Sequence, residues 1–360
     1  MKRYFIADTH SDTLMRMIDL GYSINDERLQ ISLAKMLKGG HDLQVFACFI
    51  DPVVGRDRYI SRTLQMIDLM KTEAAQNRKS MVLCDSLAAI RRAKAAGRKI
   101  ALMGIEGGHA IANDLSILRC YRELGIIYMT LTWSNTNDWA DSSGDEEKWN
   151  GLTQFGHEVV REMNRIKMLV DVSHVSDKAF WHALRTSSEP VIASHSSVRS
   201  LCSHPRNMTD EMIRAMAEKG GVIFINFYPC FLHEGFYKAY EKMSRRVQKK
   251  IEKASERWKH RPEMYTYEEE PILQAQAASL PRVGMKDVIR HIEHAVKIAG
   301  VENVGIGSDY DGTPFMPQEM EDCTSLPRLC DALHKRKFKP AEIDKIAGGN
   351  FLRVFGDVVG

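Results

Sequence analysis

The stretch that decides the fold is YFIADTHSDTL, residues 4–14. Its first four residues form an apolar run, which predicts a buried strand. Polar residues follow this run, and His10 and Asp12 lie two positions apart among them. Because side chains two positions apart on an extended chain point to the same side, both groups are aimed at one place. The stretch therefore predicts a strand that delivers an imidazole and a carboxylate to a common site.

The same pattern, an apolar run followed by a longer segment of helical periodicity, recurs along the chain. Eight such runs can be read, at residues 4–8, 43–50, 99–106, 126–132, 168–173, 190–194, 221–227 and 303–309. Continuously apolar strands separated by helices indicate a parallel sheet covered on both faces. Eight units in 360 residues favour a (β/α)8 TIM barrel over a doubly wound sheet. No GxGxxG motif follows the first run, which disfavours a nucleotide-binding fold.

Residues 233–282 depart from this rhythm, because they are charged and helical and contain no strand-like run. We therefore predict one barrel domain over residues 1–360, with residues 233–282 as a helical insertion after the seventh strand. An insertion there lies on the carboxyl side of the barrel, where lids and partner contacts are common. The alternative is a solvated helical excursion without a role in the chemistry.

The composition excludes several classes of function. Fifty basic and 47 acidic residues leave a net charge of +3, so nucleic acid is not an expected partner. No apolar run approaches about 18 residues, and the first apolar run is too short for a signal peptide, so no membrane association is expected. The seven cysteines are odd in number and form no CxxC pair, which favours a reducing, cytoplasmic location.

The active site of a barrel is built at the carboxyl ends of its strands. The residues with metal-binding or acid–base chemistry at the predicted strand ends are His10, Asp12, Glu106, His174, His195 and Asp309. Each of them alone would more often be structural. Their repeated occurrence at one rim indicates a metal site instead, and imidazole together with carboxylate suits zinc or another first-row metal.

The number of these groups favours two metal ions over one, because a single catalytic zinc takes about three protein ligands. We expect His10 and Asp12 to bind one ion, and His174 and His195, from adjacent strands, to bind the second. Glu106 has two oxygens and lies between these pairs around the ring, so it is the expected bridge. Two ions ~3.5–4 Å apart would hold a hydroxide between them and polarise a carbonyl or phosphoryl oxygen.

Asp309 then remains as the general base, which takes a proton from that hydroxide and later delivers it to the leaving group. Asp311 is the alternative for this role, but Asp309 lies nearer the strand end. His109, three residues after Glu106, is a candidate for supporting a metal ligand. Asp8 and Asp311 are candidates for the same kind of support or for turn formation.

Six motifs, DTHSD, EGG, DVSHVS, ASHSS, HPRN and GIGSDYDG, occur in the order and at the strand ends typical of the renal (membrane) dipeptidase family. The chain resembles this family from about Tyr4 to GGNFLRVFGDV, residues 348–358. The family's members are binuclear zinc peptidases on a barrel related to the amidohydrolases. The resemblance implies two Zn²⁺ ions per chain on the five ligands named above, with Glu106 bridging and Asp309 as the acid/base.

The resemblance also assigns Arg206, in HPRNMTDE, to the C-terminal carboxylate of the substrate. A guanidinium fork suits this task because it pairs with a carboxylate bidentately. A surface salt bridge beside a proline turn is the alternative for Arg206.

One position departs from the family pattern. Better-known members carry a histidine after the fourth strand, in an LTH motif, where this chain has Trp133 in TLTWSNTN. An indole donates one hydrogen bond and accepts none, so it cannot carry the charge of a histidine. Stabilisation of the transition state would then rely on the metals, on Trp133 or on neighbours such as Asn135. Trp133 as an apolar wall of the substrate site is equally open.

The expected activity is therefore that of a zinc-dependent dipeptidase acting through a metal-bridging hydroxide. The resemblance implies tolerance of a D-residue at the C-terminal position, β-lactam opening and a homodimer. Two alternatives remain. One is another binuclear hydrolase, acting on N-acyl amino acids, lactams, lactones or phosphoesters, and the other is a non-catalytic binding protein on the same barrel.

Overall fold

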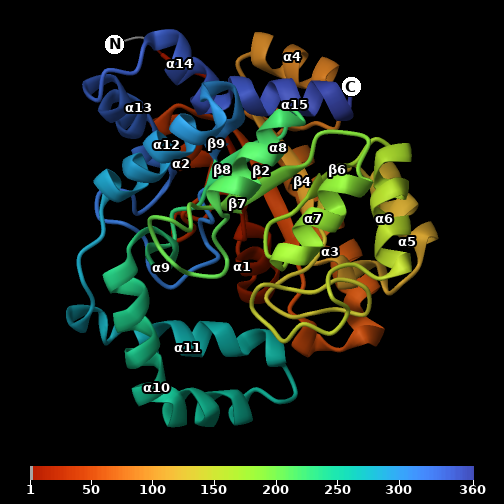
Figure 1. Cartoon of the computed structure of the whole chain (residues 1–360), viewed down its shortest axis with the longest axis vertical. Helices are drawn as coiled ribbons and strands as arrows, with labels where there is room; N and C mark the ends of the chain where they lie inside the picture. Colours follow the sequence, from red (N-terminus) through yellow and green to blue (C-terminus); the bar gives the residue numbers. More distant parts are fainter. Residues whose placement is uncertain (1–2) are drawn as a thin grey trace.

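The computed structural model describes residues 3–360, which form a barrel of parallel strands surrounded by helices (Figure 1). In their order around the sheet the barrel strands are β1 (Ile6–Ser11), β2 (His41–Phe49), β4 (Lys99–Glu106), β5 (Ile126–Thr130), β6 (Leu169–Asp171), β7 (Ile192–Ser196), β8 (Val222–Ile225) and β9 (Val304–Ile306). The chain after β9 returns to β1, because the Asp309 amide donates to His10 O at 3.2 Å and the Asp12 amide donates to Tyr310 O at 2.9 Å. The predicted (β/α)8 barrel is confirmed.

All eight predicted strands are present, with two differences in detail. A further strand, β3 (Met81–Leu83), pairs with β4 outside the barrel path. Its three residues are too few for a periodic pattern in the sequence. β1 extends through the polar residues to Ser11. It can do so because the barrel supplies partners: Thr9 Oγ1, for example, donates to Ser194 O at 2.6 Å.

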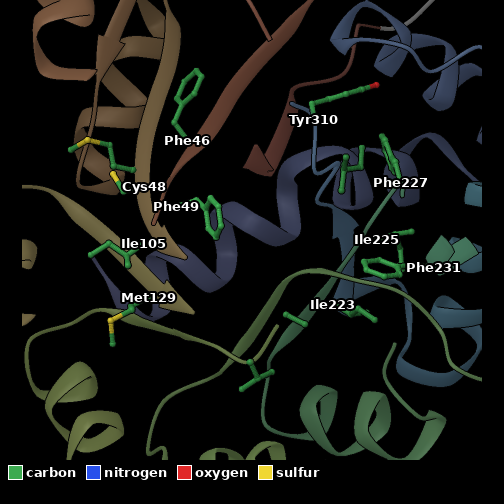
Figure 2. Packing of buried hydrophobic residues seen from close by; sticks show 14 of the residues in the cluster. Phe46, Cys48, Phe49, Ile105, Met129, Ile223, Ile225, Phe227, Phe231 and Tyr310 are labelled. Carbon is green, nitrogen blue, oxygen red and sulfur yellow. The ribbon is translucent and has the colours of Figure 1, made fainter. Parts of the chain in front are cut away.

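Alternate residues of the strands belong to two apolar clusters. In β2, Leu43 and Val45 belong to a cluster that joins residues of all the strands except β3 and β9 and so fills the barrel interior. Phe46 and Cys48 face the other way, into the larger cluster shared with the surrounding helices (Figure 2). This two-residue period explains why barrel strands read as continuous apolar runs, since both faces are covered.

The helices follow the strands as predicted, and several begin at a Ser or Thr whose hydroxyl accepts a backbone N–H of the first turn. Their bounds are α1 (Thr13–Leu20), α2 (Leu33–Gly39), α3 (Tyr59–Gln76), α4 (Leu87–Ala95), α5 (Leu115–Glu123), α6 (Gln154–Arg165), α7 (Asp177–Thr186), α8 (Asp210–Glu218), α9 (Pro229–Leu232), α10 (Glu234–Arg257), α11 (Tyr265–Gln274), α12 (Met285–Ala299), α13 (Leu326–Lys335), α14 (Pro340–Asp344) and α15 (Asn350–Val358). Phe351 and Phe355 of α15 pack into the interior cluster and close one end of the barrel. Among residues 3–360, no helix has the length and apolar character needed to cross a bilayer.

Helices α10 and α11 form the segment predicted as an insertion, and they lie at the end of the molecule opposite α15 (Figure 1). They pack on each other through a small apolar cluster that includes Val247 and Leu273. Two polar contacts join α11 to α1: Arg16 pairs with Glu270 at 2.8 Å, and Tyr267 OH donates to Asp19 Oδ2 at 3.0 Å. The segment is thus fastened to the barrel beside the loops that follow the strands.

Candidate metal centre

The structure brings together the six groups predicted at the strand ends. They are His10 in β1, Asp12 directly before α1, Glu106 at the end of β4, His174 after β6, His195 in β7 and Asp309 after β9. All six are buried, with at most 8% of any residue exposed. Asp12 precedes α1 at the position where Asp commonly caps a helix, yet its carboxylate makes no capping bond.

Glu106 lies at the centre of this cluster, and its two carboxylate oxygens face different histidines. Glu106 Oε1 lies 2.7 Å from His174 Nε2 and 3.4 Å from His195 Nε2. Glu106 Oε2 lies 3.3 Å from His10 Nε2. The Nε2 atoms of His174 and His195 are 2.9 Å apart, so these two imidazoles converge on one point.

Asp12 and Asp309 lie on the other side of His10, and ligand atoms of these three residues all fall within 4.8 Å of one another. Gly312 completes this side of the cluster, and its backbone leaves no room for a side chain. A Cβ added to Gly312 would collide with the Asp12 carboxylate and lie 2.7 Å from Asp309 Oδ1. Only glycine therefore lets the chain pass so close to both carboxylates.

The second ring nitrogen of two histidines is held by a buried hydroxyl. Tyr128 OH donates its proton to Thr9 O at 3.0 Å and lies 3.0 Å from His10 Nδ1. The Tyr128 oxygen therefore accepts the proton carried by His10 Nδ1. Ser194 Oγ donates to Asp171 Oδ2 at 2.5 Å and accepts from His195 Nδ1 at 2.8 Å. With Nδ1 held in this way, each imidazole turns its Nε2 toward the cluster, and this is the nitrogen that would bind a metal ion.

Unpaired buried atoms show that the cluster suits a cation. Neither His10 Nε2 nor Asp12 Oδ1 has a hydrogen-bond partner among the described residues, although both are buried. An unsatisfied buried polar group costs about 1–3 kcal/mol. A metal ion would satisfy both atoms, and this set of imidazoles and carboxylates is the donor set that zinc takes in hydrolases.

The charges in the cluster support one another. Burial alone would raise the pKa of Glu106, but His10, His174 and His195 outweigh it and hold the pKa of Glu106 well below its usual range. Burial lowers the pKa of His174 to about 4 and that of His195 well below its usual value. Neutral imidazole is the form that binds metal, so these two histidines are ready to act as ligands. Burial also raises the pKa of Asp309.

Two of the six residues have strained backbones. The φ angles of His174 and Asp309 are 70° and 65°, in the left-handed region that residues with a Cβ seldom adopt. Such conformations cost on the order of 1–3 kcal/mol and cluster at functional sites. The strain turns both side chains toward the centre immediately after their strands end.

Arg206 lies beside the cluster as a buried cation. Its Nη1 donates to Ser196 Oγ and its Nη2 to His195 O, both at 3.0 Å, while Nε has no partner among the described residues. Burial lowers the pKa of Arg206 to about 10. No carboxylate of residues 3–360 forms an ion pair with it, so the surface salt bridge is not present. A buried cation without a paired anion is costly and is suited to receive an anionic ligand.

A cavity of about 360 Å³ opens above the cluster and includes Glu106, His174 and Asp309 in its walls. Trp133 lines it, with ring-centre distances of 4.9 Å to Phe49 and 6.5 Å to His174. Asn135 does not line this cavity and contributes to a separate one of about 210 Å³. Of Trp133 and Asn135, which both follow the fourth predicted strand, Trp133 is the residue that faces the cluster.

The remaining candidates have structural contacts. Nε2 of His109 bonds to Ile50 O at 2.7 Å and joins the ends of β2 and β4. Asp8 accepts from Ser308 N at 2.8 Å within the barrel. Asp311 accepts from Thr13 Oγ1 at 2.7 Å and from Gln30 N at 2.9 Å, which anchors a loop that reaches the site.

Sequence reasoning missed four residues of the site: Tyr128, Asn226, Ser194 and Gly312. Asn226 Nδ2 donates to Asp309 Oδ2 at 2.9 Å and fixes that carboxylate. Asn226 directly follows β8, so the rule that found the other strand-end residues could also have found it. Tyr128, by contrast, reaches His10 from within β5 across the barrel interior. Its ring passes over Gly104, where any Cβ would collide with it.

A parallel barrel with buried histidines and carboxylates at the carboxyl ends of its strands defines the class of metal-dependent barrel hydrolases. Residues 1–359 match the model of the membrane dipeptidase family, peptidase family M19, and the chain belongs to this family. The resemblance read from the six sequence motifs is thereby confirmed.

Similar proteins are found both by sequence and by fold. An uncharacterized dipeptidase of Schizosaccharomyces pombe is 32% identical over 303 residues, which cover 84% of this chain and 63% of that protein. The match thus spans less than two thirds of that relative. The probable dipeptidase PvdM of Pseudomonas aeruginosa superposes with a TM-score of 0.87 at 23% identity, covering 99% of this chain and 96% of that one. A metallopeptidase of Rhodobacter sphaeroides, solved with a phosphinate mimic of L-Ala-D-Ala, gives 0.81 at 23% identity, with 99% and 100% covered.

Proposed function

We propose that this protein is a zinc-dependent dipeptidase that hydrolyses the amide bond of dipeptides, including those with a C-terminal D-residue. The observation that carries the proposal is a buried histidine–carboxylate cluster next to Arg206, a buried cation without a carboxylate partner among residues 3–360. This combination provides a place for metal and a place for a small substrate's carboxylate within one site.

Two zinc ions would be held by the cluster. His10 and Asp12 would hold one, His174 and His195 the other, and Glu106 would bridge them. The orientation of Glu106 supports this division, since Oε1 faces His174 and His195 while Oε2 faces His10. When bound, the ions would activate a water molecule and polarise the carbonyl of the scissile amide.

The protein's own groups would orient the substrate and move the proton. Nε of Arg206 has no hydrogen-bond partner among the described residues, which supports a role in binding the C-terminal carboxylate through the guanidinium fork. Asn226 holds Asp309 Oδ2, which leaves Oδ1 to take a proton from the attacking water and pass it to the leaving amine. The raised pKa that burial gives Asp309 suits a group that must be protonated for part of the cycle.

Trp133 would act as a wall of the substrate site. Its ring lines the cavity between Phe49 and His174, where the better-known family members have a histidine. Because indole cannot accept a proton, stabilisation of the transition state would rest on the metals. We expect tryptophan in place of histidine at this position to alter the range of substrates and to leave the type of reaction unchanged.

The proposal includes a cytoplasmic, homodimeric enzyme. The location is supported by seven cysteines that are all free thiols in the structure, as is usual in a reducing compartment. The homodimer is expected from the family alone.

The test is a metal-replete assay with a panel of L-Xaa-D-Xaa and L-Xaa-L-Xaa dipeptides, N-acyl amino acids and lactones. We expect two zinc ions per chain by elemental analysis and turnover of dipeptides that is lost on chelation and restored by zinc. Arg206→Met should raise the KM for dipeptides about a hundredfold, since the ion pair to the substrate carboxylate is lost. Unchanged KM in that variant, or turnover of the other substrates alone, would contradict the proposal.

A further inference from the structure

The cavity above the cluster has one carboxylate that the proposed reaction does not use. Apart from Asp12, Glu106 and Asp309, the described residues contribute a single acidic side chain to its walls, that of Asp51, and no lysine or arginine. Aromatic side chains form much of the rest of the walls: Phe49, Trp133, Tyr228, Phe231 and Tyr240. Asp51 is thus an anionic group in a largely aromatic part of the substrate cavity.

Asp51 lies farther from the metal cluster than the ligands do. It follows β2 by two residues, and Phe49, the last residue of β2, pairs with Glu106 of β4. The backbone of Asp51 is extended, with φ −62° and ψ 125°, so the chain advances roughly 7 Å beyond Phe49. At this height Asp51 would lie beyond the scissile bond of a substrate bound at the cluster, level with the substrate's side chains.

Asp51 also lies across the barrel from Arg206. In the strand order β1-β2-β4-β5-β6-β7-β8-β9, β2 and β7 are four positions apart in a ring of eight. The Arg206 guanidinium bonds to His195 and Ser196 of β7. A dipeptide held by its carboxylate at Arg206 would therefore extend its N-terminal residue toward the rim where Asp51 lies.

No cation of the described residues neutralises Asp51. Its Oδ1 accepts the Val53 amide at 3.0 Å, and no ion pair reaches either oxygen within residues 3–360. Burial, with a contribution from the charge of Asp19, raises the pKa of Asp51. Arginines of the same region are committed elsewhere: Arg56 pairs with Asp138 at 2.8 Å and Arg62 with Asp19.

We propose that Asp51 selects dipeptides whose N-terminal residue carries a cationic side chain, with arginine preferred to lysine. A guanidinium can pair with Asp51 and also stack on the rings of Phe49 and Trp133, which an ammonium does less well. This inference rests on the proposed dipeptidase function and on carboxylate binding at Arg206. It names the side-chain specificity of that same site.

The test compares L-Arg-D-Ala with L-citrulline-D-Ala, which has the same shape without the charge. The protein should have a kcat/KM about 10- to 100-fold higher for the arginine substrate, the range expected for a charge-assisted bond. In Asp51→Asn this ratio should fall to near one, because the amide still accepts the Val53 N–H but carries no charge. In Asp51→Lys the preference should shift to L-Glu-D-Ala.

A matched control is Asp57→Asn, the same change at an exposed residue of the same loop, which should keep the ratio of the unmodified protein. A ratio near one in the unmodified protein, or a ratio that Asp51→Asn leaves high, would overturn the specificity while dipeptide turnover itself persists. Absence of turnover with every dipeptide would instead overturn the proposed function and this inference together.

Discussion

At the scale of single residues, the proposed site residues depend on supporting side chains, and two of the three supports lie far away in the sequence. His10 and His195 present Nε2 to the cluster because Tyr128 and Ser194 hold their Nδ1 atoms. Asp309 is fixed by Asn226 in the same way. Supporting contacts of this kind determine the orientation and the tautomer of a ligand, and they affect metal affinity as well as packing.

Asp309→Asn should retain zinc and lose turnover by about 10²–10⁴-fold, because an amide cannot take up the proton of the attacking water. Steady-state kinetics and elemental analysis of the same preparation give both quantities. Dipeptide turnover at the rate of the unmodified protein would show that another group, such as Asp311, does this work.

Glu106→Ala should lose zinc instead, because one carboxylate would serve both ions. We expect less than one ion per chain after dialysis against metal-free buffer. Glu293→Ala, at a residue that pairs with Arg336 near the surface, is the control and should keep its metal. Full occupancy in Glu106→Ala would contradict the bridging role.

His291 should make stability depend on pH. Its Nδ1 accepts the Val198 amide and its Nε2 bonds to Leu232 O, and burial lowers its pKa from 6.5 to about 4. As the pH falls below about 6.5, the unfolded chain gains a proton at this position before the folded protein does, so stability is lost between pH 6.5 and 4. The loss from this group should be about 2 kcal/mol at pH 5 relative to pH 7.5.

Urea unfolding at pH 5 and at pH 7.5 measures this loss of stability. Glutamine does not titrate, so the drop in the free energy of unfolding from pH 7.5 to pH 5 should be about 2 kcal/mol smaller in His291→Gln than in the unmodified protein. His334→Gln, at an exposed histidine, should behave like the unmodified protein. Equal pH dependence in all three proteins would contradict the assignment.

At the scale of elements, strand irregularities adjust the positions of the ligands. The register between β1 and β2 shifts between Asp8 and Ser11, and that between β7 and β8 shifts between Ala193 and Ser196. These segments carry His10 and His195. Such shifts re-aim side chains and are common beside active sites. The apolar pattern predicted where the strands lie, but it could not predict these local shifts.

Helix α11 depends on α1 for its position. Tyr267→Phe removes the hydroxyl that donates to Asp19 Oδ2, a loss of about 1 kcal/mol. Amide exchange in residues 265–274 should therefore become about fivefold faster, measured by mass spectrometry. Tyr22→Phe is the control, because the hydroxyl of Tyr22 forms no hydrogen bond within residues 3–360. Equal exchange rates in both variants would show that other contacts hold α11.

At the scale of the whole molecule, the proposed metal centre should stabilise the barrel, because its five proposed ligands come from four of the eight barrel strands or the loops after them. Zinc at about 100 times its Kd adds about 2.7 kcal/mol to the free energy of unfolding. For a chain of 360 residues this raises Tm by on the order of 4 °C. Thermal unfolding with zinc and with a chelator measures the difference, and identical Tm values would contradict a bound ion.

The sequence by itself determined the barrel, its strands and the identity of the six groups at its rim. It could do so because apolar periodicity records which residues are buried, and because parallel strands bring all their carboxyl ends to one face. The tertiary structure decided what depends on contacts across the barrel. Only it brought Tyr128 to His10, Gly312 against Asp12 and Asp309, and Asp51 opposite Arg206. These relations join segments up to about 300 residues apart, and no local pattern in the chain encodes such distances.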